Sequence, residues 1–288
     1  MKVRDTLKRV WFSLFSPDRI MLLEYPLRVT SLQTGQNKPS HQKLFNLISE
    51  NRPIYRQILE NTIKYKNVFS TIREDKFLEN DCDPGWNNGY LPGLDMVILY
   101  SMLAQFNPTT YIEIGSGTST KVAFKSKREN SLNCEIISID PAPRRNISQV
   151  ANKIHSNRIQ EEDLKIFETL SENDIVFFDG THMLLPDSDV TCFFLEILPK
   201  LKKGVIVHIH DIYLPYDYPQ FMLNRYYNEQ YLLAALLLAN PDKFEIICPN
   251  YFIYCDKELH GLLDPIWQLN NLAGVEQHGG SFWMKIKG

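Results

Sequence analysis

The chain has 288 residues, with 31 basic and 34 acidic side chains and a formal net charge of −3. This balance argues against a protein that binds nucleic acid through a basic surface, so we expect no nucleic acid partner. Hydrophobic residues make up 44% of the chain and charged residues 23%, which excludes the disordered and low-complexity classes. A chain of this length and composition can bury a large core.

Cysteine usage and hydropathy indicate a reducing compartment and no membrane span. The five cysteines are scattered, and none belongs to a CxxC pair, which argues against a disulfide framework or a zinc site. We therefore expect a cytoplasmic protein. The longest apolar run, residues 231–239, is much shorter than the roughly 20 residues of a transmembrane helix, so no transmembrane segment is expected.

The amino-terminal part of the chain is predicted to be helical. Basic residues surround an apolar run at residues 10–15, for which we favour a short helix packed on the domain; an amphipathic segment at a membrane surface is the alternative. Farther on, apolar residues recur at helical spacing between Leu44 and Leu59, interrupted at Pro53. We predict an α-helical cap or extension over residues 1–89 and a second domain over residues 90–288.

The second domain has a regular alternation of helical and strand-like segments. A helical stretch at residues 95–106 leads into a short β-branched run at residues 111–114. The further strands that we predict cover residues 135–139, 174–178, 204–208, 244–254 and 281–286. Alternation of this kind predicts an α/β fold with a doubly wound, mostly parallel sheet, in which the carboxyl ends of the parallel strands meet at one edge.

A glycine-containing loop follows the first strand, with the sequence EIGSGTST at residues 113–120. Glu113, two positions before Gly115, would repel a diphosphate but attract the ammonium and sulfonium groups of S-adenosylmethionine. The carboxylate of that ligand would meet the start of the next helix and the hydroxyl of Ser119. Thr120 stands where a dinucleotide-binding fingerprint has its third glycine, which argues against an NAD-dependent oxidoreductase.

Asp140 ends the second predicted strand, 23 positions after Gly117. An acidic residue at this place accepts hydrogen bonds from the ribose hydroxyls of bound nucleotides. Asp140 therefore supports an adenosine-containing ligand without distinguishing S-adenosylmethionine from NAD. Taken alone, it is also explained as a strand-end aspartate that starts a turn before Pro141.

Polar side chains also follow the next two strands, and we predict that they form the catalytic half of the site. Asp179 and His182 follow one strand, and His210 and Asp211 follow the other. Asp179, His210 and Asp211 would offer ligands to Mg²⁺ or another divalent cation. In the alternative, His182 or His210 is a general base.

Strand alternation limits which of these residues meet. His208 and His210 point to one face of the fourth strand and Asp211 to the other, so we do not expect all three to converge unless the backbone turns. We expect His208 to be a hydrogen-bonded structural residue. The aromatic segment at residues 215–229 has two interpretations that stay open, a lid over a substrate and aromatic packing of a long connection.

Over residues 90–288 the chain resembles class I S-adenosylmethionine-dependent methyltransferases, and within them a bacterial branch related to small-molecule O-methyltransferases. The resemblance is carried by residues 111–117, Asp140, and the segments DGTH at 179–182, VIVHIHDI at 205–212 and GGSFW at 279–283. It implies a Rossmann-like sheet of seven strands whose last strand is antiparallel. It also implies that the cofactor is held by Glu113, Gly115, Ser116, Gly117, Ser119, Asp140 and Asp179. His210 departs from the acidic residue that metal-dependent relatives usually carry there.

The resemblance implies methyl transfer from S-adenosylmethionine to the oxygen of a small hydroxylated metabolite, a sugar or a glycan precursor. His182, His210 and Asp211 are the expected catalytic residues, with Asp179, His210 and Asp211 as the metal set. Two other functions are kept as alternatives, an NAD-dependent oxidoreductase and a catalytically inactive binding module with the methyltransferase fold. An oligomer is left open.

Overall fold

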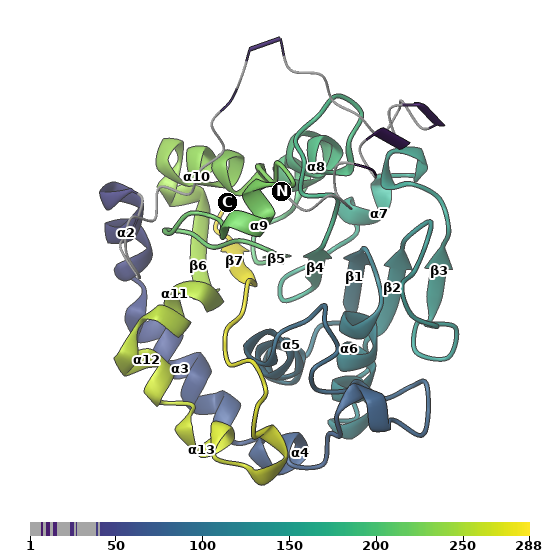
Figure 1. The fold of residues 1–288 in the computed structure, drawn as a ribbon, viewed down its shortest axis with the longest axis vertical. Helices are drawn as coiled ribbons and strands as arrows, with labels where there is room; N and C mark the ends of the chain where they lie inside the picture. Colours follow the sequence, from purple (N-terminus) through teal and green to yellow (C-terminus); the bar gives the residue numbers. More distant parts are fainter. Residues whose placement is uncertain are drawn as a thin grey trace. The chain divides into compact units, whose positions relative to one another are not determined.

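The computed structural model describes residues 41–288 and, before them, Leu7, Val10, Trp11, Leu14, Phe15, Glu24, Tyr25, Leu27 and Pro39. The chain divides into two compact units, Met1–Thr30 and Ser31–Gly288, and the labelled elements of Figure 1 lie in the second. Most of the segment predicted to rest on a domain or a membrane surface lies outside the described residues. Among the described residues, every helix is too short or too polar to cross a membrane.

The described strands form one sheet of seven in the order β3-β2-β1-β4-β5-β7-β6, with β3 and β6 at its edges (Figure 1). β1 to β5 pair in parallel, and β7 runs antiparallel to both β5 and β6. This confirms the predicted Rossmann-like, doubly wound α/β fold with an antiparallel last strand. The strands are β1 (Thr110–Ile114), β2 (Glu135–Ile139), β3 (Lys153–His155), β4 (Ile175–Phe178), β5 (Ile206–Ile209), β6 (Phe244–Pro249) and β7 (Phe282–Ile286).

The observed strands differ from the predicted ones in three places. β3 was not predicted, because it is a three-residue edge strand that is largely exposed and has no run of apolar residues. The strand expected at residues 244–254 ends at Pro249, and the apolar residues that follow form the helix α11 (Asn250–Cys255). β5 starts at Ile206, because the left-handed backbone of Gly204 (φ 86°) belongs to the preceding turn.

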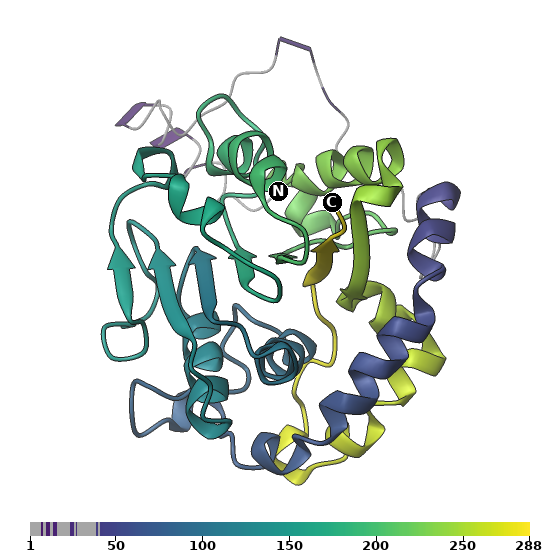
Figure 2. The same ribbon diagram turned by 180° about the vertical axis from the view of Figure 1, so that it is seen from behind.

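Helices cover the sheet from two sides (Figures 1 and 2). α5 (Gly93–Phe106) and α6 (Thr118–Glu129) pack side by side on one side of the strands, while α8 (Asp189–Cys192) and α10 (Glu229–Ala239) lie on the opposite side. The other helices are α2 (Gln42–Ser49), α3 (Arg52–Ile63), α4 (Lys66–Phe69), α7 (Lys165–Glu168), α9 (Gln220–Leu223), α12 (Lys257–Gly261) and α13 (Asp264–Trp267). α8 continues into a π-helical turn, Phe193–Ile197.

α5 is the helix that passes through the core. Its residues are apolar on all sides, and those from Gly93 to Leu103 are all buried, as expected for a helix without a solvent face. Asn107 ends it in the left-handed conformation, with φ 48°. Asp95, in its first turn, is the only charged residue of α5 and is completely buried. A buried carboxylate requires compensating partners.

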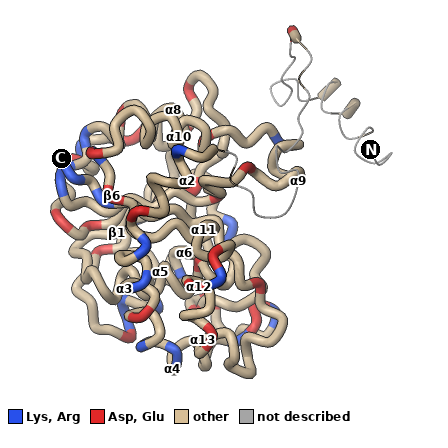
Figure 3. The backbone as a smooth tube through the Cα atoms, turned by 90° about the vertical axis from the view of Figure 1, so that its left-hand side faces the viewer, with Lys and Arg blue, Asp and Glu red and all other residues tan. Residues whose placement is uncertain are grey.

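The amino-terminal helices of the second unit join the same core. Tyr55, Leu59 and Phe69 are fully buried with the residues of the sheet, and α3 contacts both α5 and β6. In Figure 2 these helices lie beyond the β6 edge, next to α12 and α13. That residues 1–89 act as a cap which helps to define a substrate site stays a prediction. Figure 3 shows Lys and Arg interspersed with Asp and Glu along the described backbone.

Candidate active site

The residues that follow β1, β2, β4 and β5 lie together at one edge of the sheet. The backbone N–H of Gly115 donates to the carbonyl of Ile139, that of Asp179 to Ile114, and that of His210 to Phe178. These bonds continue the ladder by one residue beyond each strand. The edge at which parallel strands end is where ligands bind in open α/β sheets.

A first cavity of about 350 Å³ lies above β1 and β2. Asp140 lies on its wall and accepts hydrogen bonds from the backbone N–H and the hydroxyl of Ser116, at 2.8 and 3.0 Å. Gly115, also on the wall, has φ 82°, and a Cβ there would collide with the carbonyl oxygen of Asp179. Asp179 and Thr181 complete this polar lining.

Glu113 lies beneath the loop and lines none of the cavities found among the described residues. Its carboxylate is completely buried and accepts from the hydroxyls of Tyr111 (3.2 Å), Ser119 (3.1 Å) and Thr120. Burial raises the pKa of Glu113 to about 8, although the three donors oppose this change. Gly117 and Ser119 border a separate hollow of about 30 Å³.

A second cavity of about 700 Å³ adjoins the first, and Asp179 and Arg144 line both. Its floor contains the imidazoles of His182 and His210 and the carboxylate of Asp211. Aromatic side chains contributed by distant segments form its walls: Tyr90, Tyr213, Phe221, Tyr227, Tyr251 and Tyr254. The aromatic segment before α10 therefore lines this cavity in part, while its Tyr216 and Tyr218 are buried in the protein.

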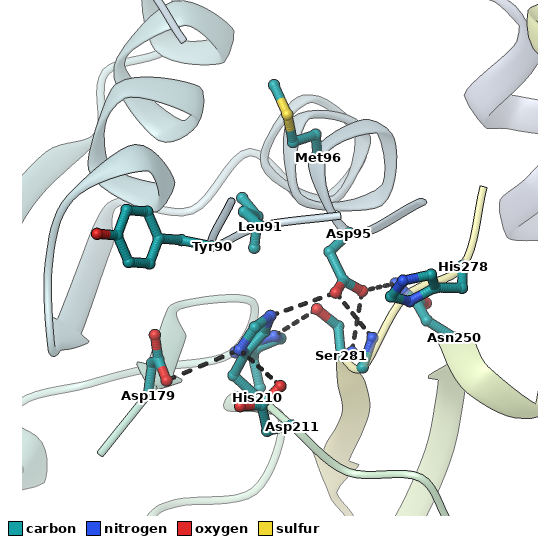
Figure 4. A network of polar contacts seen from close by, with 12 residues as sticks. Tyr90, Leu91, Asp95, Met96, Asp179, His210, Asp211, Asn250, His278 and Ser281 are labelled. Atoms are coloured by element: carbon teal, nitrogen blue, oxygen red, sulfur yellow. Dashed lines mark hydrogen bonds and ion pairs between the residues drawn. The ribbon is translucent and has the colours of Figure 1, made fainter. Parts of the chain in front are cut away.

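The buried carboxylate of Asp95 contacts the imidazole of His210. Its Nε2 lies 3.2 Å from the Asp95 carboxylate, which also accepts from the side chain of Asn250 and the backbone N–H groups of Gly280 and Ser281, at 2.7 to 2.9 Å (Figure 4). Burial alone would raise the pKa of Asp95, but His210 and the other donors lower it to about 2. Burial would likewise lower the pKa of His210, but Asp211, Asp179 and Asp95 raise it well above its usual value.

His182 is held in the same way by Glu229, the first residue of α10. Its Nδ1 lies 2.5 Å from the Glu229 carboxylate, and its Nε2 lies 3.4 Å from Asp179 and 3.5 Å from Asp211. Burial would lower the pKa of His182, but Glu229 and the two aspartates raise it to about 9. Glu229 is completely buried, which raises its own pKa.

The structure thus brings together the side chains of Asp179, His182, His210 and Asp211. His210 Nδ1 lies 3.7 Å from Asp179 and 3.6 Å from Asp211. His210 and Asp211 face the same cavity because the backbone turns at Asp211, which has φ 55°. His208 does not join them. It stacks on the ring of Phe177 at 3.8 Å and hydrogen-bonds to the hydroxyl of Ser281, as expected for a structural histidine.

Sequence reasoning missed the parts played by Asp95 and Glu229. The signal for Asp95 was a single carboxylate inside an otherwise apolar helix, which should have predicted a buried partner. Glu229 was noted only as part of the aromatic segment. In the part of the chain that the structure describes, no three His, Cys, Asp or Glu side chains are placed to hold a metal ion. The metal set of Asp179, His210 and Asp211 stays a prediction.

Comparison with known proteins adds a family match. Residues 112–212 match the model of a family described as a methyltransferase domain, and every predicted site residue lies within this stretch. A protein of Archaeoglobus fulgidus without an assigned function is 35% identical over 93 residues, which are 30% of this chain and 42% of that protein. The chain therefore matches less than half the length of this relative.

Solved structures give weaker likenesses. The SAH-bound methyltransferase PaMTH1 of Podospora anserina is 14% identical, with a TM-score of 0.43 over 88% of this chain and 100% of the other. The SAH-bound plantazolicin methyltransferase BpumL is 10% identical, with a TM-score of 0.41 over 86% of this chain and 100% of the other.

Proposed function

We propose that the chain is a class I S-adenosylmethionine-dependent methyltransferase that methylates a hydroxyl oxygen of a small acceptor such as a sugar or a glycan precursor, and the match of residues 112–212 to a methyltransferase domain supports this. The pair of adjoining cavities carries this proposal. The first cavity takes the cofactor and the second takes the acceptor. Asp179 lines both, whereas His182 and His210 line only the second.

The first cavity offers groups that suit the cofactor. When bound, S-adenosylmethionine supplies an electrophilic methyl group on a sulfonium ion. Asp140 would accept hydrogen bonds from the ribose hydroxyls, and the backbone at Gly115 and Ser116 would border the ligand. Gly117 and Ser119, at the start of α6, border the separate small hollow and would receive the amino-acid carboxylate there. Glu113 does not line the cavity, so we assign it a role through the hydroxyls that it holds and, once a cationic ligand lowers its pKa and ionises it, through its charge.

The second cavity suits a polyhydroxylated ring. Its volume is in the usual range for small-molecule sites, about 300 to 1,000 Å³. Tyrosine predominates on the walls, and each tyrosine offers both a flat apolar face and a hydroxyl that donates and accepts. A sugar ring presents the same combination of apolar C–H groups and hydroxyls.

His182 is the proposed general base. As the acceptor oxygen bonds to the methyl carbon and the carbon–sulfur electron pair stays on sulfur, the hydroxyl proton passes to His182 Nε2. The carboxylates of Glu229, Asp179 and Asp211 stabilise the resulting imidazolium. The same carboxylates raise the pKa of His182, whereas a cationic ligand in the neighbouring cavity lowers it. A cationic ligand therefore shifts His182 toward the neutral imidazole that a general base requires.

The experiment is transfer of labelled methyl groups to a panel of monosaccharides, nucleotide sugars, hydroxylated aromatics and matched amines. We expect transfer to hydroxyl acceptors by the wild type, and transfer slower by about 10² to 10⁴-fold in His182→Gln, although this variant still binds S-adenosylhomocysteine in calorimetry. Transfer to amines alone would overturn O-methylation, and absence of S-adenosylhomocysteine binding would overturn the cofactor assignment.

A chelator arm tests the metal prediction. If a divalent cation on Asp179, His210 and Asp211 activates the acceptor, the chelator abolishes turnover and Mg²⁺ restores it. If His182 is the base, turnover is the same with and without the chelator.

A further inference from the structure

We infer that Glu229 is a positioning residue for methyl transfer, which holds His182 so that Nε2 faces the second cavity. The inference rests on the proposed role of His182 as general base. It assigns a function to a buried carboxylate that lines neither cavity.

The first argument is the direction of the hydrogen bond. A carboxylate only accepts, so the 2.5 Å contact to Glu229 places a proton on Nδ1 of His182. In the neutral imidazole, Nε2 is then the nitrogen with the free lone pair. Nε2 is also the nitrogen that lies 3.4 and 3.5 Å from Asp179 and Asp211 at the floor of the second cavity. Glu229 therefore selects the tautomer that accepts a proton from the acceptor side.

The second argument is that the residues around Glu229 hold the whole loop after β4. The N–H of Asn228 donates to the carbonyl of His182 at 2.9 Å, and the Asn228 side chain accepts from the N–H of Leu184 at 2.6 Å. The ring of Tyr227 packs 4.4 Å from the His182 ring. His182 itself has φ 62°, a conformation that needs such support in a residue other than glycine.

The third argument is that no other hydrogen bond of Glu229 in the described structure explains why a buried carboxylate stands at this position. The N-cap position of α10 belongs to Asn228, so Glu229 does not cap the helix, and no side-chain hydrogen bond caps it. The Oε2 atom of Glu229 is buried without a hydrogen-bond partner in the described structure. A carboxylate retained only for stability would have its oxygens paired, because an unpaired buried oxygen is unfavourable. The single bond to His182 is the contact that accounts for its position.

The test compares Glu229→Gln with the matched control Asp217→Asn. Gln keeps the shape of Glu but removes the charge. Asp217 is also buried, precedes α10 in the same segment, and bonds to the Tyr231 hydroxyl at 2.5 Å without lining the second cavity. We expect kcat to fall roughly 100-fold or more in Glu229→Gln, with KM for the acceptor and the S-adenosylhomocysteine affinity within about twofold of wild type. Asp217→Asn should leave kcat within about threefold.

A double-mutant cycle separates positioning from folding. If Glu229 acts through His182, Glu229→Gln produces no further loss of kcat in a His182→Gln background. Multiplicative losses of kcat would mean that Glu229 acts independently of His182 and would overturn the inference. Glu229→Asp, which keeps the charge on a shorter side chain, should recover part of the activity.

A second readout does not depend on turnover. In protein with ¹⁵N-labelled histidine, studied above pH 9 where His182 is neutral, we expect the His182 signal of an imidazole protonated at Nδ1, and its loss in Glu229→Gln but not in Asp217→Asn. Absence of this signal in wild type overturns the inference and leaves the proposed function standing. If the signal is present but no hydroxyl acceptor is methylated, the proposed function is what fails.

Discussion

Both histidines of the second cavity are backed by a buried carboxylate, but the two carboxylates have different surroundings. Asp95 accepts from His210, Asn250, Gly280 and Ser281, and its pKa is lowered to about 2. Among the residues that the structure describes, Glu229 accepts from His182 alone, and its pKa is raised. Asp95 is therefore held by several partners in the fold, so the Asp95 pair contributes mainly to stability. Glu229 has His182 as its partner, so the Glu229 pair contributes mainly to the placement of that histidine.

Loss of the Asp95 charge should have the largest effect on stability. Asp95→Asn replaces one of the two accepting oxygens by an NH₂ group, so that one backbone N–H faces a donor, and it leaves His210 without its buried counter-charge. We expect the free energy of unfolding to fall by about 3 to 5 kcal/mol, and Glu229→Gln to lower it by less than half as much. Urea unfolding of both variants measures the difference. Equal losses would contradict the distinction between the two pairs.

Removal of each imidazole should separate catalysis from structure. We expect His182→Gln to reduce kcat by about 10² to 10⁴-fold, the usual contribution of a general base. His210→Gln should mainly reduce stability, because Asp95 then loses one of its four donors. Methyl-transfer kinetics and thermal melting of both variants check this. If His210→Gln has the larger effect on kcat, His210 rather than His182 is the general base.

His182 and Asp95 should limit stability at opposite ends of the pH range, and His210, whose pKa is also raised, adds to the alkaline loss. The pKa of His182 rises from 6.5 to about 9 on folding, so its stabilisation is complete below about pH 6.5 and is lost as pH rises through 9. The groups that face it are Glu229, Asp179, Asp211 and the ring of Tyr227. The pKa of Asp95 falls from 3.8 to about 2, so its stabilisation is present above pH 3.8 and is lost as pH falls through 2.

Urea midpoints between pH 2 and pH 10 measure both limits. In Glu229→Gln the loss of stability at alkaline pH should begin at a lower pH. The reason is that the substitution removes the carboxylate that raises the pKa of His182 most. An unchanged alkaline limb in this variant would contradict the assignment.

The smallest effect is expected at Glu113, which is buried beneath the loop that borders the first cavity. Glu113→Gln should weaken S-adenosylmethionine a few-fold, and S-adenosylhomocysteine less, because only the former carries the sulfonium charge. Calorimetry with both ligands measures this ratio. Equal weakening of both would show that Glu113 supports the loop through its hydroxyl partners rather than through its field.

The local sequence pattern predicted most strands of the sheet and the residues of the candidate site that directly follow a strand. Strand runs stopped by glycine or polar residues are short-range signals, and the carboxyl ends of parallel strands must meet, so Asp140, Asp179 and His210 were predictable. The edge strand β3 lacks such a run. The buried carboxylates were not predictable in this way, because Asp95 and His210 are 115 positions apart, and His182 and Glu229 are 47 apart.

The contacts between Asp95 and the start of β7 have a consequence for the order of folding. Two of the groups that Asp95 binds belong to Gly280 and Ser281, which follow it by 185 and 186 positions, and Ser281 also partners His208. Contacts of such large sequence separation form only after both parts of the chain are present and close together. The surroundings of His208 and His210 are therefore completed when β7 joins the sheet, later than the local turns and helices around them.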